Sequence, residues 1–412
     1  MCAGRVFTTL RRAEYAELIG LFFLIGAALA MWFVPLSAVL EAHGLGHIRP
    51  VAFASSGVAA FISPLLFGAM ADRHASPVKV LRGLALATAI TVTLATTAIR
   101  EGWGPLPVLA FIQLHSLCSS PTWSIASTII LARLRDAPRE FGPVRAMATF
   151  GWMGGCLWVS LIGADRSTAS GYSGAVLWLV VVAFTFLLPS VESPRAGEAR
   201  SWVQRLGLDA LTLLKIRDHR VVFLTTTLFT IPLAGFYPYA PPHLKELGLE
   251  RMTAWMSLGQ VTEVIAMFAL GGLILRWRLK WIIAAGLGFG VIRFVVSALD
   301  TRTGLIAGIV LHGCSFTLVN ITAQIYLDQR VEPSWRGRAQ ALLSLMNGGF
   351  GNLLGYLGTG AWFAACSATG KTQWSSFWLG LAVSVAGVLA VFLVAYRGRS
   401  SGLTPPPFAR SG

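Results

Sequence analysis

The chain has 412 residues, of which 55% are hydrophobic and only 12% are charged. Because about a quarter of the residues of a soluble domain are charged, this composition excludes water as the main solvent of the protein. The net charge of +15 does not indicate a nucleic-acid-binding protein, because Lys and Arg lie in short segments between long apolar runs and not on one face of a domain.

The N-terminal segment, residues 1–12, is basic and leads into an apolar run that starts at Leu18. The run is long enough to span a membrane and contains no small-residue cleavage pattern. We therefore expect a retained first membrane helix, and the alternative is a cleaved signal peptide.

Twelve segments have the character of a membrane-spanning helix, which needs about 20 mainly apolar residues. The expected spans are residues 17–40, 50–71, 78–99, 104–131, 143–164, 171–190, 221–242, 253–275, 280–299, 303–327, 338–365 and 374–396. The predicted fold class is therefore an all-α membrane protein of twelve transmembrane helices. Lys and Arg are concentrated in the segments on the side of both termini, which predicts cytoplasmic termini.

The loop after the second span combines small residues with charges, from Phe67 through Asp72 and Arg73 to Arg82. Small residues let helix ends approach closely, and Asp72 can pair with a basic group on a neighbouring helix end. The loop resembles the signature loop of the major facilitator superfamily, where such a pair can latch one state of a transporter. We therefore expect Asp72 and Arg73 to have a gating or structural role; the alternative is an ordinary cytosolic turn.

The fifth span begins with a cation, a hydroxyl and a large aromatic ring on one helical face. These are Arg145, Thr149 and Trp152, at positions i, i+4 and i+7. Such a face can hydrogen-bond a polar ligand and stack on a flat ring. The alternative for Arg145 is a cytosolic anchor at a helix end.

The longest polar stretch, residues 192–220, has six expected spans before it and six after it. Its apolar positions alternate with charges and predict a helix on the inner membrane surface: they are Trp202, Leu206, Leu208, Leu211 and Leu214. We expect an N-terminal six-helix bundle in residues 1–191, a basic cytoplasmic linker in 192–220, and a C-terminal six-helix bundle with a short tail in 221–412.

The two halves show internal similarity. The pair Arg145-Ala146 opens the fifth span and Arg338-Ala339 opens the eleventh, and two consecutive glycines follow each pair. Parallel repeats of this kind place a transporter's solute near the membrane midplane, between the halves. We therefore predict two bundles related by pseudo-twofold symmetry.

An acidic residue, Glu263, lies inside the eighth span, with Gln260 three residues earlier on the same helix face. An ionised group at that depth costs several kcal/mol, so it normally faces a cavity or a partner and serves a function. A carboxylate whose surroundings change between inward and outward states can load and release a proton. The alternative is a structural ion pair between helices.

The tenth span carries polar and aromatic residues at four-residue spacing: His312, Phe316, Asn320 and Gln324. A polar stripe on an apolar helix must face protein or water and not lipid. We therefore expect His312 and Phe316 to line a cavity. Arg293, in the ninth span, is expected to have a gating or structural role and to pair with a neighbouring helix or with backbone carbonyls; the alternative is a contact with substrate.

Neither a metal site nor an enzyme active site is expected. The five cysteines form no C-x-x-C cluster and suit helix packing. His115 and His312 lie in separate spans, and no catalytic motif accompanies either. We therefore expect no cofactor, no bound metal and no enzymatic activity, with His115 in a structural role.

At these residues the chain resembles the nucleoside–proton symporter family of the major facilitator superfamily. The resemblance runs along most of the chain and is sharpest at Pro121-Thr122, at residues 145–152, at Gln260-Val261-Thr262-Glu263, and in the passage from Leu311-His312-Gly313 to Arg338-Ala339-Gln340. It implies a central cavity that holds a nucleoside by base stacking and ribose hydrogen bonds.

By the same resemblance, Arg145 and Thr149 match polar contacts of the fifth span, Trp152 matches its aromatic contact, and Gln260 and Glu263 match directly. Phe316 matches an aromatic residue of the tenth span. His312 stands where a characterised member has Tyr.

Two departures from the family pattern bear on the solute and on proton coupling. Family Gln and Asn contacts of the seventh span align with Ala234 and Tyr237, so that one base or sugar contact is missing or replaced. Thr317 stands where a characterised member has an acid. Proton coupling would then depend on Glu263, together with His312.

We therefore expect proton-coupled uptake of nucleosides or a related small polar solute by alternating access, in a monomer embedded in the bilayer of a bacterial inner membrane. A second interpretation is a permease or exporter of the same superfamily for a sugar, an aromatic acid or a drug-like compound, since fold does not fix substrate. A third is a receptor that binds solute without moving it.

Overall fold

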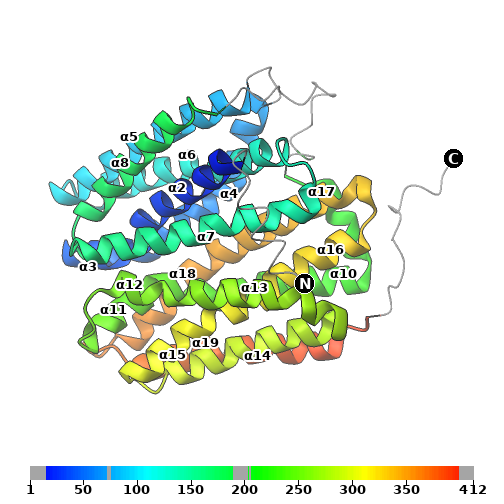
Figure 1. The fold of residues 1–412 in the computed structure, drawn as a ribbon. Coiled ribbons are helices and arrows are strands. Elements are labelled where there is room, and N and C mark those ends of the chain that lie inside the picture. Colours follow the sequence, from blue (N-terminus) through cyan, green and yellow to red (C-terminus); the bar gives the residue numbers. More distant parts are fainter. Residues whose placement is uncertain (1–14, 72–75, 189–202, 204–205, 399–412) are drawn as a thin grey trace. The chain divides into compact units, whose positions relative to one another are not determined.

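The computed structural model describes residues 15–71, 76–188, 203 and 206–398. Within these ranges every secondary-structure element is a helix (Figure 1). Seven helical segments of this part of the chain are long and apolar enough to cross a membrane: Ala16–Ala42, Pro77–Arg100, Arg217–Glu246, Met252–Arg276, Leu279–Ser297, Arg302–Arg330 and Trp374–Ala395. Ala169–Phe184 is a shorter apolar helix. The all-helical class is therefore confirmed.

The chain forms two compact units. Unit 1 comprises Met1–Ser55, Ile62–Ala199 and Glu250–Ser257, and unit 2 comprises Ser56–Phe61, Arg200–Leu249 and Leu258–Gly412. The helices from the first half of the chain are α2 (Ala16–Phe33), α3 (Leu36–Ala42), η2 (Gly46–Ile48), α4 (Arg49–Ala71), α5 (Pro77–Arg100), α6 (Pro105–Leu131), α7 (Ala137–Leu161) and α8 (Ala169–Phe184). Unit 1 also holds the short helix α12 (Met252–Met256).

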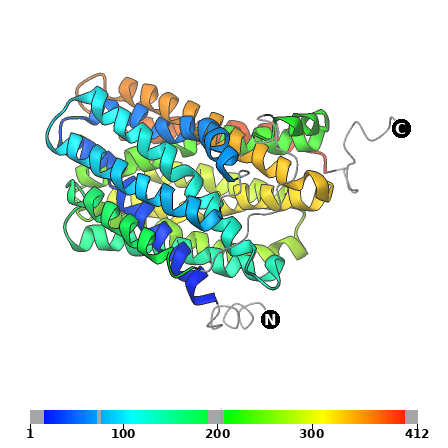
Figure 2. The ribbon, with the colours of Figure 1, turned by 90° about the horizontal axis from the view of Figure 1, so that it is seen from above.

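The helices of unit 2 follow from the second half of the chain. They are η3 (Leu208–Lys215), α10 (Arg217–Leu233), α11 (Phe236–Glu246), α13 (Leu258–Arg276), α14 (Leu279–Ser297), α15 (Arg302–Phe316), η4 (Thr317–Ile321), α16 (Thr322–Arg330), α17 (Pro333–Ser344), η5 (Leu345–Gly351), α18 (Asn352–Cys366) and α19 (Trp374–Ala395). Figure 2 shows the long helices of each unit running alongside one another.

In unit 1, helix α7 packs against α2 at backbone distance. A Cβ atom added to Gly26 of α2 would lie 2.1 Å from the carbonyl oxygen of Ala148, and one added to Gly151 of α7 would lie 2.0 Å from that of Phe23. Only glycine allows the two backbones to approach this closely. The contact fixes the position of the α7 turn that carries Thr149 and Trp152.

In unit 2, helices α13 and α15 make an equally close contact. A Cβ atom added to Gly313 would lie 2.0 Å from the backbone nitrogen of Glu263. The hydroxyl of Thr262 donates to the carbonyl of Val310 across the same contact. This close contact, called the glycine seam below, fixes the position of Glu263 and its turn of α13 relative to α15.

The tenth predicted span is not one uninterrupted α-helix. Residues Thr317–Ile321 form a π-helix, and a second π-helix, Leu345–Gly351, interrupts the eleventh predicted span. A π-helix has wider turns than an α-helix, and such segments often occur at functional sites. Residues spaced four apart therefore share one α-helical face only from His312 to Phe316, and Asn320 lies in the π-helix beyond it.

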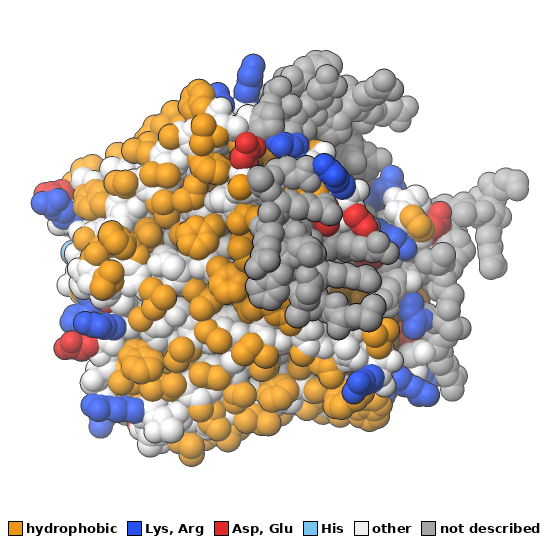
Figure 3. All heavy atoms as spheres, in the orientation of Figure 1, with side chains coloured by type: hydrophobic (Ala, Val, Ile, Leu, Met, Phe, Trp, Pro, Cys, Tyr) orange, Lys and Arg blue, Asp and Glu red, His pale blue; other side chains and the backbone are white. Residues whose placement is uncertain are grey.

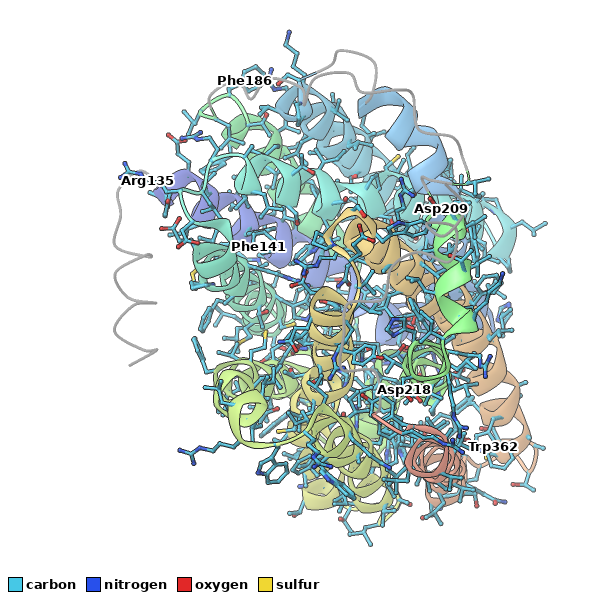
Figure 4. The ribbon with its side chains drawn as sticks, turned by 90° about the vertical axis from the view of Figure 1, so that its right-hand side faces the viewer. Arg135, Phe141, Phe186, Asp209, Asp218 and Trp362 are labelled. Atoms are coloured by element: carbon cyan, nitrogen blue, oxygen red, sulfur yellow. The ribbon has the colours of Figure 1, made fainter. Side chains whose placement is uncertain are left out.

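The linker between the halves is described only in part. Its segment Leu208–Lys215 is a 3-10 helix in which Ala210 and Leu213 are buried. Arg338 of α17 pairs with Asp209, at 3.2 Å between Nη1 and Oδ2 (Figure 4 labels Asp209). Trp202 lies outside the described residues.

Near the described C-terminal end, the backbone nitrogen of Arg397 donates to Asp218 Oδ1 at 3.1 Å (Figure 4). Burial, and next the charge of Asp218, raise the pKa of Tyr396 above its ordinary value, while Arg330 opposes the shift. These contacts join the start of α10 to the residues that follow α19.

The protein surface carries large apolar side chains in the open. Leu106, Leu275 and Val394 are at least 80% exposed. Figure 3 shows hydrophobic side chains over most of the visible face, with Lys and Arg mainly near its edges. Such a surface is costly in water and is suited to hydrocarbon.

Candidate solute-binding site

The expected site residues fall into two groups, one in each unit, and each group is described by itself. The group in unit 1 lies on α7: Arg145, Thr149 and Trp152. The group in unit 2 comes from α11, α13 and α15: Tyr237, Gln260, Glu263, His312 and Phe316.

The three α7 residues share a partly exposed face, as their spacing predicts. Arg145, Thr149 and Trp152 are half-buried, while the exposed apolar side chains of Phe150, Leu157 and Leu161 lie on the opposite side of the helix. The guanidinium carbon of Arg145 lies 5.8 Å from the centroid of the Trp123 ring of α6. This face therefore presents a cation, a hydroxyl and an indole in line.

The unit 2 group begins with a hydrogen bond between two helices. Gln260 of α13 donates from Nε2 to the hydroxyl oxygen of Tyr237 of α11, at 3.1 Å. Helix α11 starts anew at Phe236, because α10 ends at Leu233 after an internal proline. This break sets the position of Phe236 and Tyr237 within unit 2.

Aromatic rings surround His312. The ring of Phe236 stacks on it at 4.4 Å between centroids and 20° between planes. Tyr237 meets it edge-on at 6.0 Å, and Phe316 lies 6.0 Å away, 25° from parallel. The imidazole is 4% exposed. It is therefore held in one orientation by the rings around it.

Arg293 of α14 contacts the same ring. Its guanidinium donates to Nδ1 of His312, and its Cζ lies 4.3 Å from the centroid of Phe236. The residue is 1% exposed. The structure thus gives Arg293 a side-chain partner on a neighbouring helix, and this partner is one of the expected site residues.

Glu263 lies on the side of α13 away from the exposed apolar side chains. Val261, Ile265 and Phe268 are 37%, 60% and 54% exposed. At 100° per residue, Gln260 and Glu263 lie on the opposite side of the helix. Glu263 itself is half-buried, so it is neither sealed in the core nor placed on the most exposed face.

The two departures from the family pattern have local structural roles. Ala234 is buried at the end of α10. A Cβ atom added to Gly355 of α18 would lie 2.6 Å from the Cβ of Ala234, so Ala234 packs α10 against α18. Thr317 is buried and donates to the backbone oxygen of Glu263 at 3.5 Å. Both positions therefore contribute packing or helix contacts.

Sequence reasoning placed Asn320 in the polar stripe of the tenth span but missed the polar cluster that it forms on the two π-helices. Asn347 of η5 donates from Nδ2 to Oδ1 of Asn320 of η4 at 3.4 Å. Thr227 of α10 donates to Oδ1 of Asn347 at 3.1 Å. A signal was present, because Asn347 is an amide inside an apolar span directly before the Gly348-Gly349 pair.

Other predictions fall outside this site. Asp72 and Arg73 lie outside the described residues. His115 is buried, with its ring 5.3 Å from that of Trp32. The described residues contain no group of three or more His, Cys, Asp or Glu side chains that could hold a metal ion.

Comparisons with known proteins identify the family of the chain. The family model of nucleoside H+ symporters matches residues 16–401. The chain is 33% identical over 399 residues to YegT of Escherichia coli (strain K12), covering 90% of this chain and 91% of that protein. It is 26% identical over 346 residues to the nucleoside permease NupG of the same organism, covering 79% and 82%.

The fold is also that of a solved transporter. The crystal structure of a mutant of the nucleoside transporter NupG superposes with a TM-score of 0.86 at 25% identity, covering 93% of this chain and 100% of that chain. The chain is therefore a multi-pass membrane transporter and not an enzyme. It belongs to the nucleoside H+ symporter family.

Proposed function

We propose that this nucleoside H+ symporter family member imports a nucleoside or a closely related small polar solute, driven by protons and by alternating access of two six-helix bundles. The observation that carries the proposal is the position of Glu263. This acid shares a helix face with Gln260, opposite the exposed apolar side chains of α13. An acid so placed in a membrane helix is costly unless it serves function.

In this proposal both groups of residues bind the solute. Phe316 and Trp152 supply ring faces for a nucleobase. Arg145, Thr149 and Gln260 supply hydrogen bonds, with Gln260 held by Tyr237. A ligand pocket with a few polar groups among aromatic rings is typical of small-molecule sites.

Proton coupling is assigned to Glu263, with His312 as its neighbour in the site. A proton on Glu263 and a bound solute together permit the change between inward-facing and outward-facing states. Deprotonated Glu263 disfavours that change, because an ionised carboxylate would lose its hydration. This arrangement links proton entry to solute entry. Asp72 and Arg73 are proposed to gate the change.

The proposed setting is a monomer with twelve spans and both termini in the cytoplasm of a bacterial cell. The bundles comprise residues 1–191 and 221–412, joined by the basic linker 192–220. The excess of Lys and Arg on the side of the termini supports this orientation.

Uptake into proteoliposomes tests the proposal. The Glu263→Gln variant keeps size and hydrogen bonding but cannot release a proton. It is expected to lose pH-driven nucleoside accumulation while it retains exchange of internal for external nucleoside. Glu101→Gln, an exposed acid after the end of α5, is the matched control. Unchanged accumulation by the Glu263→Gln protein would remove the proton role of Glu263.

A second candidate is a permease of the same fold for another small solute. Ala234 favours it, because a packing residue stands at a position that contacts solute in the family pattern. Thermal-shift measurements with nucleosides and with sugars separate the two. Stabilisation by a sugar alone would establish the second candidate.

A further inference from the structure

The contact between Arg293 and His312 determines which imidazole nitrogen carries hydrogen. A guanidinium has donors only and no acceptor. Because Arg293 donates to Nδ1 of His312, Nδ1 must offer its lone pair. The hydrogen of the neutral ring is then on Nε2.

The second nitrogen is not used by the protein. Among the described residues, Nε2 of His312 has no hydrogen-bond partner. The residue is 4% exposed, Phe236 stacks on its ring, and the ring of Phe316 lies 6.0 Å away. Nε2 of His312 is not among the fully buried polar atoms that lack a partner, so part of its surface is open and this N–H can donate to a ligand.

Arg293 is unlike a purely structural cation. It forms no ion pair with a carboxylate in the described part of the chain, and its Nε atom has no hydrogen-bond partner there. Its charge is met by the ring faces of Phe236 and Phe294, at 4.3 Å and 4.8 Å. A buried cation placed only to join helices would normally pair with a carboxylate.

We propose that Arg293 is a positioning residue that holds His312 in the Nε2–H tautomer, and that this N–H donates to an acceptor on the solute. The identity of the solute as a nucleoside is taken from the proposed function. On a nucleoside the acceptor is a base carbonyl oxygen, a ring nitrogen or a ribose hydroxyl. The helices packed around the ring carry these other titratable groups: Tyr237, Tyr239, His243, Lys245 and Glu246 on α11, Glu263 and Arg276 on α13, Lys280 on α14, and Arg302 and Cys314 on α15.

Nitrogen NMR of protein labelled with ¹⁵N-histidine tests the tautomer without any solute. His312→Gln identifies the signal of His312 among the seven histidines. Wild type is expected to show the Nε2–H form. Arg293→Met is expected to lose it, whereas Arg293→Lys is expected to keep it, because an ammonium also only donates. An Nδ1–H form in wild type, or no change in Arg293→Met, overturns the proposal.

His243 serves as an internal reference in the same spectra. Its Nδ1 accepts from Nε1–H of Trp378 at 2.9 Å, and its Nε2 bonds Asp300 at 2.7 Å. Its signal should therefore report the Nε2–H form in every Arg293 variant. A change in the His243 signal would show that Arg293→Met disturbs the whole unit. In that case the tautomer of His312 in Arg293→Lys tests the proposal.

Binding measurements test the link to the solute. Arg293→Met is expected to weaken nucleoside binding about tenfold and to make binding pH-dependent between pH 5 and 8, because the released imidazole can take a second proton. The double variant Arg293→Met, His312→Gln should lose that pH dependence. Weaker binding with an unchanged pH profile contradicts the proposal. If wild type binds no nucleoside but shows the Nε2–H form, the proposed function fails and the tautomer assignment stands.

Discussion

At the scale of single residues, local spacing in the sequence predicts which candidate site residues share a helix face. Gln260 and Glu263 are three residues apart, so their common helix face follows from helix geometry alone. The stacking of Phe236 on His312 could not be predicted in this way, because the two rings come from different helices and meet only through tertiary packing. Arg293 was expected to pair with a neighbour, but the sequence did not show which one.

The hydrogen bond between Tyr237 and Gln260 gives a prediction at this scale. Tyr237→Phe removes the hydroxyl that accepts from Nε2. Nucleoside affinity is expected to fall about fivefold, as for the loss of about 1 kcal/mol of hydrogen bonding. Tyr172→Phe, which removes a hydroxyl that bonds Thr97 in unit 1, is the control and should leave the affinity, measured by calorimetry, unchanged.

At the scale of elements, the helices were predicted well because apolar runs of membrane length are a strong signal. The π-helices at Thr317–Ile321 and Leu345–Gly351 were not predicted. Their sequences carry the same apolar character as an α-helix, and only the backbone hydrogen bonds distinguish them. For the same reason, the four-residue spacing, which assumes an α-helix, could not predict the contact of Asn320 with Asn347.

The glycine seam between α13 and α15 gives a prediction for the element scale. Gly313→Ala places a methyl group against the backbone nitrogen of Glu263. We expect a loss of about 1–3 kcal/mol in stability from overpacking, seen as a lower melting temperature, together with reduced transport. Gly272→Ala adds a methyl group to α13 where nothing lies within 4 Å. That variant should melt at the wild-type temperature or above it.

The amide cluster on the π-helices gives a second prediction. Asn347→Ala removes the amide that donates to Asn320 and accepts from Thr227, whose hydroxyl also donates to the carbonyl of Phe223. Leaving buried polar groups unsatisfied is expected to cost about 1–3 kcal/mol. Asn347→Asp restores an acceptor for Thr227 but no donor for Asn320, so its melting temperature should lie between those of wild type and Asn347→Ala. Equal melting temperatures for all three proteins would show that the cluster contributes nothing to stability.

At the scale of the whole molecule, composition alone excluded an aqueous protein, and family membership makes the chain a multi-pass transporter. The orientation remains a prediction from the distribution of Lys and Arg. A fluorescent protein fused to the C-terminus should fluoresce, whereas alkaline phosphatase at the same position should be inactive. Active phosphatase would place that terminus outside the cytoplasm.

Proton movement on solute addition tests the central claim most directly. Proteoliposomes with a pH-sensitive dye inside, and no imposed gradient, should acidify internally when nucleoside is added outside to wild-type protein. Glu263→Gln should exchange nucleoside at a comparable rate without any acidification. Acidification by the Glu263→Gln protein equal to that of wild type would contradict the account, because protons would then enter without the carboxylate of α13.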